Sequence, residues 1–443
     1  MKLELFALCL MQRLRHSRRD MIAFSNAQEL PMPHQTKKFT DSNWSWKTTS
    51  PFSQAVEIGD QVFISGQQAL THDGELVAPG DIGSQTRCVF ENMKATLASA
   101  GLKLSDLVRL NTYYVFDGAD EDATKYWEEM TKVRLEYFPD PGPAATAVRI
   151  KGMPYQGQLI QIEGIALRGA SRSNRKRIMP KDSWDWSIPV PLSQGWDAGD
   201  RVYVGGQISS DKNGASVHIG DLSAQTRAIY NFIGNVLKEG GSSFEDVAHI
   251  KICVKYASTE PDGISFLDRI LDVTKEYFGS SGPAVTCFGV DLLYPGLDLE
   301  IDAMAFKGTQ ERTSIGTALT KVHDGYFSDC VSTLGEIWIG GQVAQGLDGA
   351  VMAPGDIEQQ SRIVFERLKD ALVPSGATLD DIVKLNLFFV SDGNDVSEEL
   401  HAAMAAWAEM APHSTPAMTP VRVYELSQPG LLIQADCIAM KPT

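Results

Sequence analysis

Three acidic side chains recur at one position of a repeated pattern. Glu163, Asp302 and Asp436 each stand two residues after another polar residue in a strand-like stretch, with one apolar residue between. Side chains alternate between the two faces of a strand, so each acid shares a face with the polar residue before it. A carboxyl group beside a substrate can take up or give a proton. The alternative is a structural hydrogen-bonding role for a buried acid.

Other chemical motifs are sparse. The six cysteines stand singly, with no Cys-x-x-Cys pair and no metal-like spacing to histidine, so free thiols are expected. None of the eight histidines pairs with another at ligand spacing, and we predict no metal and no cofactor. The chain contains no Gly-x-Ser-x-Gly, no His-Glu-x-x-His and no phosphate-binding glycine-rich loop. The machinery of the common hydrolase and nucleotide-binding classes is therefore absent.

The overall charge argues against a polyanionic partner. Lys and Arg number 40 against 56 Asp and Glu, a formal net charge of −16, so nucleic acid is not expected. No apolar run reaches the roughly 18 residues that span a bilayer, so no membrane partner is expected. Near the N-terminus the apolar stretch precedes the basic residues, the wrong order for a secretory signal. A cytoplasmic location is expected, with organelle targeting by residues 1–25 and a start at Met21 left open.

The sequence repeats itself three times. Residues 62–67 recur at 202–207 and 337–342, at offsets of 140 and then 135 residues. Three further landmarks keep the same order, the last shifted by two residues as a loop deletion would do. They are a Gln-Thr/Ser-Arg segment at 85–87, 225–227 and 360–362, an aspartate at 106, 246 and 381, and Pro-Ala-x-Thr at 143–146, 283–286 and 416–419. Collinear self-similarity of this kind indicates tandem structural units.

Each repeat predicts the same elements in the order β-β-α-β-α-β-β, an α+β fold. Alternating apolar residues around the Gly-Gln landmark predict a hairpin, and the Gln-Thr/Ser-Arg segment opens about 20 residues with helical spacing. A β-rich stretch, an acidic helix and two closing strands follow. The predicted strands are Leu107–Val115, Val247–Tyr256 and Ile382–Val390, with Ala144–Ile150 and Gln158–Ala166 closing the first repeat.

Repeat matching also sets the predicted domain boundaries. We expect a disordered or targeting leader over 1–40 and three domains over 41–168, 182–307 and 320–443. Between domains the matching fails, and the basic run 172–181 is predicted to be a solvated linker. Trp44 and Trp46 recur as Trp184 and Trp186, which favours packing over ligand contact.

The landmarks resemble the Rid family, also called the YjgF-type or endoribonuclease L-PSP family. The resemblance rests on residues 51–56, 63–67, 85–87, 143–144 and 162–166, and the three copies cover roughly 45–440. It implies chorismate-mutase-like units that assemble as trimers, with an inner β-barrel, outer helices and ligand clefts between neighbours. Three units in one chain would form a covalent pseudo-trimer, either monomeric or as a homo-oligomer. Cyclic-amide hydrolases have a similar three-unit architecture without this sequence pattern.

The resemblance implies hydrolytic deamination of imines and enamines, with one departure. Active members hold the substrate carboxylate with an arginine directly after Pro-Ala, and this position carries Ala145, Val285 and Met418 here. An apolar side chain cannot replace a charged hydrogen bond worth about 1.5–3 kcal/mol. Arg149 and Arg422 lie four residues further on the same strand face and could hold a differently placed anion. A pair with a surface carboxylate is the alternative.

The remaining candidates come from matching family positions. The resemblance makes Glu163, Asp302 and Asp436 candidates for acid–base catalysis, and Cys287 and Ser65 the visible nucleophiles for a cyclic-amide reaction. Small-residue packing is the alternative for Cys287. The substrate-binding candidates, besides the two arginines, are Phe52, Gly66, Ala145 and Phe327.

These residues favour a Rid-type hydrolytic deaminase acting in clefts between fused domains. Its expected partner is a small-molecule substrate with an imine, enamine or related C–N bond, outside the usual imino acids. Two alternatives stay open: a cyclic-amide or amine hydrolase on the same scaffold, and a non-catalytic ligand-binding pseudo-trimer.

Overall fold

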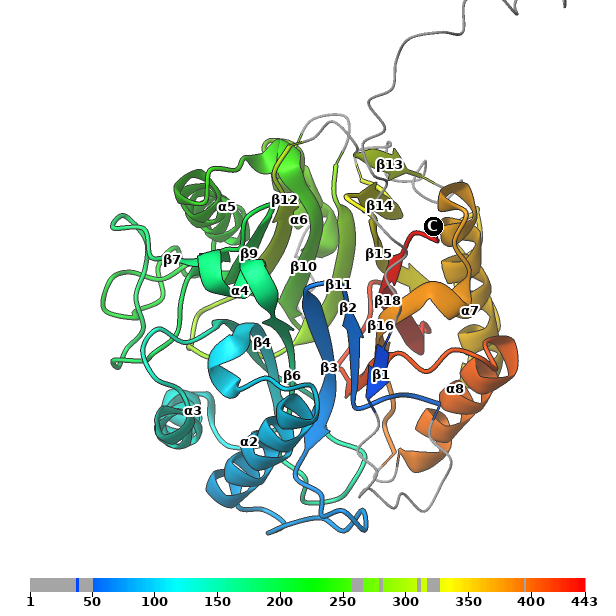
Figure 1. Cartoon of the computed structure of the whole chain (residues 1–443), viewed down its shortest axis with the longest axis horizontal. Coiled ribbons are helices and arrows are strands. Elements are labelled where there is room, and N and C mark those ends of the chain that lie inside the picture. Colours follow the sequence, from blue (N-terminus) through cyan, green and yellow to red (C-terminus); the bar gives the residue numbers. More distant parts are fainter. Residues whose placement is uncertain are drawn as a thin grey trace, which may run out of the picture. The chain divides into compact units, whose positions relative to one another are not determined.

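Three six-stranded sheets, each accompanied by helices, make up the described part of the chain (Figure 1). The computed structural model describes residues 37–39, 51–256, 266–278, 282–308, 312–316, 327–393 and 396–442. We call the three parts unit 1 (residues 37–167), unit 2 (176–306) and unit 3 (313–440). Apart from residues 37–39, the predicted leader lies outside the described residues, as do Trp44 and Trp46.

All three sheets have one strand order. A short edge strand and a hairpin come first, the last strand of the unit follows, and two parallel strands end the sheet. In unit 1 these are β1 (Lys37–Phe39), β2 (Ala55–Ile58), β3 (Gln61–Gln68), β6 (Ile160–Leu167), β4 (Leu107–Tyr114) and β5 (Ala144–Arg149). In unit 2 they are β7 (Lys176–Ile178), β8 (Gly195–Asp197), β9 (Arg201–Ile208), β12 (Leu299–Phe306), β10 (Val247–Lys255) and β11 (Ala284–Val290). In unit 3 they are β13 (Thr313–Ile315), β14 (Cys330–Thr333), β15 (Glu336–Val343), β18 (Ile433–Met440), β16 (Ile382–Phe389) and β17 (Ala417–Arg422).

Two helices accompany each sheet, and the first begins at an aspartate. Asp81, Asp221 and Asp356 accept a backbone N–H bond three residues on, which satisfies a free helix donor. The first helices are α2 (Ile82–Ser99), α5 (Leu222–Glu239) and α7 (Ile357–Leu372). The second helices, which connect the parallel strands, are α3 (Asp120–Tyr137), α6 (Phe266–Lys275) and α8 (Ser397–Met410).

The glutamine of the Gln-Thr/Ser-Arg landmark is structural. The Gln85 amide donates to the carbonyl of Ala78 at 3.0 Å and of Gly157 at 2.7 Å, and its oxygen accepts from Leu159 N at 2.7 Å. Gln225 and Gln360 make equivalent bonds in their own units. The landmark therefore recurs because it ties the start of the first helix to the loop before the last strand.

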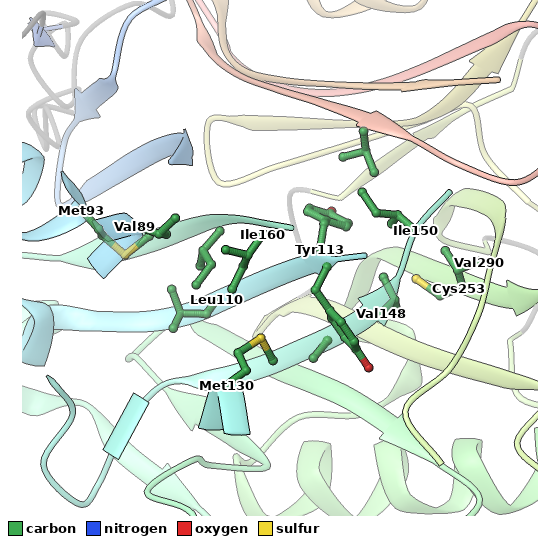
Figure 2. Close-up of a cluster of buried hydrophobic side chains, with 14 of the residues drawn as sticks. Val89, Met93, Leu110, Tyr113, Met130, Val148, Ile150, Ile160, Cys253 and Val290 are labelled. Carbon is green, nitrogen blue, oxygen red and sulfur yellow. The ribbon is translucent and has the colours of Figure 1, made fainter. Parts of the chain in front are cut away.

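The core of unit 1 lies between its helices and its sheet and continues into unit 2. Figure 2 shows Val89 and Met93 of α2 and Met130 of α3 among the side chains that cover the strands. Cys253 and Val290 of unit 2 belong to the same cluster. Units 1 and 2 thus share a continuous apolar core.

The predicted elements are confirmed, with one addition in each unit. The short edge strands β1, β7 and β13 precede the predicted hairpins. Strand β7 lies in the basic run 172–181 predicted to be a solvated linker, and helix α4 (Gly169–Asn174) overlaps the start of that run. That prediction is wrong because the backbone of β7 pairs with β8, and Arg177 bonds the carboxylate of Asp140 at 2.7 Å.

Equivalent residues of the three units meet one another. Gln61 Nε2 and Arg201 Nε both donate to Glu336 Oε1, at 2.7 and 2.8 Å, and the three residues occupy one position of the repeat. Isolated bridges link unit 1 to unit 2, unit 2 to unit 3 and unit 3 to unit 1. Among the described residues, continuous strand pairing stays within three separate sheets, so the closed inner barrel is not confirmed.

None of the helices in the described part of the chain combines the length and the apolar character that crossing a membrane requires.

Candidate functional site

A cavity of about 260 Å³ lies between units 2 and 3, and we call it the 2/3 cleft. Strands β11, β15 and β18 and helices α6 and α7 supply most of its lining residues, and the connecting segments supply the others. Two of the predicted site residues, Cys287 and Phe327, line it. The cleft is thus built at the boundary between two units, as the family resemblance implies.

Two glycines of β15 let the strands approach closely at this cleft. A Cβ on Gly340 would lie 2.6 Å from the carbonyl oxygen of Val285, and one on Gly341 would lie 2.5 Å from Cδ of Gln434. The pairing of β15 with β18 shifts register between Ile339 and Gln342. Such a bulge redirects the side chains around it. The Gly-Gly pair therefore shapes the cleft and brings the Gln434 amide into it.

Helix α7 contributes a cation that the sequence prediction missed. Arg367 donates through Nη2 to the carbonyl of Gln345, while its buried Nη1 has no hydrogen-bond partner among the described residues. Burial lowers the pKa of Arg367, and the carboxylates of Asp329 and Asp370 only partly offset that effect. The repeat places Asn92 and Phe232 at the matching positions of units 1 and 2. A comparison of the three copies for charge changes could have found it.

The cleft holds a further unpaired donor and an acid. Gln434 Nε2 is buried and, like Arg367 Nη1, has no partner among the described residues. Asp329 also lines the cleft, at the position where units 1 and 2 carry Gln54 and Gln194. The combination of a guanidinium, an amide and a carboxyl group can orient a small polar molecule that carries a negative charge.

Cys287 lies in the 2/3 cleft as a protonated thiol. Burial raises its pKa to about 12, and the charge of Glu425 acts in the same direction. A thiol is a nucleophile only as the thiolate. The thiolate fraction at neutral pH is therefore about 1000-fold lower than for a thiol with the ordinary value near 9.

We expect Cys287 to resist alkylation in the folded protein. Iodoacetamide should label it about 1000-fold more slowly than the unfolded chain at pH 7.5, with the rate rising about tenfold per pH unit up to pH 10. Mass spectrometry of the peptide that contains residue 287 measures the rate. Labelling at the unfolded rate would contradict the burial of this thiol, and the peptide that contains the half-buried Cys88 in the same digest serves as the internal reference.

The three recurring acids lie elsewhere, around a central chamber of about 40 Å³. Glu163 and Asp436 line it together with Lys251 and Lys384, and Asp302 forms an ion pair with Arg109, which also lines it. None of the acids lines the 2/3 cleft. Each unit supplies one of the three acids. Two of the acids accept a hydrogen bond from a threonine of the preceding unit: Asp302 from Thr146 at 3.1 Å and Asp436 from Thr286 at 2.9 Å.

Burial and neighbouring charges shift the pKa values of several groups in this chamber. Burial alone would raise the pKa of Glu163, but the ammonium groups of Lys384 and Lys251 outweigh it and lower the pKa to about 2. Burial lowers the pKa of His249 to about 3, so its imidazole is neutral. Burial raises the pKa of Asp436. A carboxylate as firmly ionised as Glu163 is poorly suited to exchange protons near neutral pH.

Three further predicted residues lie where unit 3 meets unit 1. Ser65 Oγ donates to the carbonyl of Ser53 and accepts from Met418 N at 3.0 Å. A Cβ on Gly66 would lie 1.9 Å from Gln161 Nε2, so glycine is needed there. Phe52 packs against the core of unit 3.

Both predicted arginine anchors already have protein partners. Arg149 donates to the carbonyl of Leu292 at 2.9 Å and pairs with Asp120 at 3.0 Å and Asp291 at 2.7 Å. Arg422 donates to the carbonyls of residues 391 and 393. For Arg149 these contacts fit the alternative, a pair with a surface carboxylate, better than an anion anchor, whereas Arg422 bonds backbone carbonyls instead.

Comparison with known proteins agrees with the repeat analysis. The sequence profile of the endoribonuclease L-PSP family matches residues 44–168, 187–307 and 320–441. A RutC family protein of Pyrococcus horikoshii is 38% identical over 122 residues, which are 28% of this chain and 90% of that protein. A 2-iminobutanoate/2-iminopropanoate deaminase of Dermatophagoides farinae is 31% identical over 117 residues, 26% of this chain and 85% of that protein.

One solved structure matches a stretch about as long as one repeat. RidA from the Antarctic bacterium Psychrobacter sp. is 27% identical, covers 30% of this chain and 100% of its own, and gives a TM-score of 0.26. The three profile matches together cover most of the sequence. The chain belongs to the endoribonuclease L-PSP family and carries three copies of its domain in tandem.

Proposed function

We propose that this protein is a hydrolytic deaminase of the Rid type, acting on an imine, enamine or related C–N bond of a small metabolite in the 2/3 cleft. Membership of the family and its relative named as an imine deaminase support the reaction class. The contacts between equivalent residues of the three units support a covalent pseudo-trimer with an inner barrel. The 2/3 cleft is large enough for a small metabolite.

The observation that carries the proposal is that one cleft is lined by both Arg367 and Gln434, whose Nη1 and Nε2 atoms are buried and have no hydrogen-bond partner among the described residues. The family's strand arginine is replaced by Val285 in this cleft. Arg367 supplies a charged donor from helix α7 instead, so the anionic group of the substrate lies nearer that helix. The substrate therefore differs in shape from the usual imino acids.

The reaction requires few groups. Water adds to the carbon of the C=N bond and one of its protons passes to the nitrogen. The proton of the new hydroxyl group then also reaches the nitrogen, the C–N bond breaks, ammonia leaves and a carbonyl forms. In this proposal Arg367 and Gln434 hold the substrate and Asp329 takes the proton from the attacking water. Glu163, Asp302 and Asp436 position the strands from the central chamber, and the protonated Cys287 acts at most as a weak donor.

Ammonia release tests the proposal, with Arg367→Met as the decisive variant. The wild type should release ammonia from some members of a panel of imines generated in situ, aromatic amines and cyclic amides. Loss of a charged hydrogen bond of about 1.5–3 kcal/mol should lower kcat/KM about 10- to 100-fold in Arg367→Met. Asp329→Asn should lower kcat with little change in KM.

Arg362→Met is the matched control. Arg362 lies on the same helix and pairs at the surface with Glu358 and Glu409, so turnover should not change. No ammonia from any compound with the wild type would refute the deaminase. Unchanged kcat/KM in Arg367→Met would refute the role of Arg367 in holding the anionic group of the substrate.

A non-catalytic ligand-binding protein is the second candidate, and Gln434 favours it. Unit 2 carries Glu300 at the strand position that Gln434 occupies in unit 3. A carboxyl group can exchange a proton with a substrate, but the amide of Gln434 can only form hydrogen bonds, which is sufficient for binding. Stabilisation of the wild type by a compound of the panel without ammonia release would select this candidate. The cyclic-amide hydrolase gains no comparable support, because Cys287 is protonated and the Ser65 hydroxyl is bonded to two backbone groups.

A further inference from the structure

The boundary between units 1 and 2 holds a second cleft built like the 2/3 cleft but filled. Ala145, Ala147 and Gly206 occupy the positions that Val285, Cys287 and Gly341 hold in the 2/3 cleft. Trp184 and Trp186, whose ring centroids lie 4.8 Å apart, line the cleft and leave a cavity of only about 20 Å³. This volume holds a single particle of about the size of one water molecule.

A buried cation lines this small cavity. Arg134 of α3 has no solvent-exposed side-chain surface. Its Nη2 donates to Thr112 Oγ1 at 3.0 Å, and neither Nε nor Nη1 has a hydrogen-bond partner among the described residues. Burial lowers its pKa to about 10, so the guanidinium is still charged at neutral pH.

Further unpaired donors accompany the cation. Trp127 Nε1 and Thr131 Oγ1 are buried without a partner among the described residues, and they lie seven and three residues before Arg134 on the same face of the helix. Trp127 lines the cavity as well. Glu300 also lines it, and burial together with the charge of Asp302 raises the pKa of Glu300 well above its ordinary value, which favours the uncharged form of this acid.

The charge balance decides what the cavity holds. A buried charge without a counter-charge costs several kcal/mol, and a water molecule supplies hydrogen bonds but no charge. We propose that the cavity binds one small inorganic anion, of the size of chloride, between Arg134 and the Trp127 indole N–H. Units 2 and 3 carry Thr274 and Trp407 at the position of Arg134, so this anion site is present once in the chain.

Anomalous diffraction and melting curves test the site. Crystals of the full chain grown or soaked in bromide should show an anomalous peak in this cavity in the wild type and none in Arg134→Met. In solution, raising chloride from 1 to 100 mM at constant ionic strength, with gluconate as the balancing anion, should raise the Tm of the wild type by several degrees. Gluconate is too large for the cavity.

Matched variants separate anion binding from folding. Arg134→Met keeps an unbranched apolar stem but removes the guanidinium, and it should melt at the same temperature in both salts. Trp127→Phe keeps an aromatic ring but removes the indole donor. The chloride concentration that gives half of the Tm increase should therefore be at least threefold higher in this variant. Equal melting of the wild type in both salts, or density without a bromide signal, would show that the cavity holds water and would overturn the proposal. Neither result bears on the deaminase, whose residues line the 2/3 cleft.

Discussion

Lys384→Met is expected to lower the free energy of unfolding by about 3–5 kcal/mol. Lys384 forms an ion pair with Glu163 in the central chamber, and the side chains are 6% and 3% exposed. Removing this cation leaves the buried carboxylate with the more distant Lys251 ammonium, 3.9 Å from Glu163 Oε1, and with the neutral Asn111 amide, which donates to Oε1 at 2.7 Å. Breaking one side of a buried pair costs more than replacing both sides, because the remaining charge stays desolvated. Urea denaturation followed by circular dichroism measures the change.

The double variant separates charge from packing. Glu163→Gln removes the stranded charge while keeping the shape, so Lys384→Met/Glu163→Gln should recover at least half of the loss. Lys369→Met serves as the control, since Lys369 pairs with Glu366 on the exposed face of α7 at 2.9 Å and should change stability by less than about 0.5 kcal/mol. A double variant as unstable as Lys384→Met would show that the lysine acts by packing alone.

The fold could be predicted almost completely from the sequence. The repeat spacing placed the landmarks, and each landmark has a local physical role, such as the Gln85 amide that joins a helix start to a loop. The edge strands could not be predicted, because residues such as Lys176 and Thr313 enter a sheet only when a neighbouring strand is there to pair with them. Local propensity carries no signal for such tertiary pairing.

The site was harder to predict, because residues expected on the same face of one strand line two different cavities. Alternation predicts that Gln434 and Asp436 share a face of β18, yet Gln434 lines the 2/3 cleft and Asp436 lines the central chamber. The bulge opposite, at Gly340 and Gly341, decides which side chain reaches the cleft. A period-two pattern gives the face of a strand but not the position along it at which another unit makes contact.

Differences among the copies proved more informative than their similarities. The landmarks that all three units share support the fold, whereas Arg367 and Arg134 each occur in one unit only. Each is a charged residue where the other units have an uncharged one, and each has a buried nitrogen without a partner among the described residues. In a fused repeat protein, one copy can gain a polar group for a ligand while the others keep the core intact.

Glu336→Ala is expected to cost about 3–5 kcal/mol, at the point where the three units meet. Its side chain is fully buried and accepts from Gln61 at 2.7 Å, Arg201 at 2.8 Å and Trp338 Nε1 at 3.0 Å. Burial would lower the pKa of Arg201, but the Glu336 carboxylate outweighs it and raises the pKa. Alanine removes the acceptor of three buried donors and leaves the guanidinium poorly compensated.

The same variant distinguishes contact between units from stability within one unit. Because the lost bonds join unit 1, unit 2 and unit 3, Glu336→Ala should also increase hydrogen exchange in β3, β9 and β15 more than in the outer helices. Glu336→Ala/Arg201→Met should recover part of the loss, while Asp200→Asn, which alters a half-exposed partner of Arg201, should cost less than about 1 kcal/mol. Exchange that rises evenly over all elements, or a loss below 1 kcal/mol in Glu336→Ala, would contradict a role for this carboxylate in holding the units together.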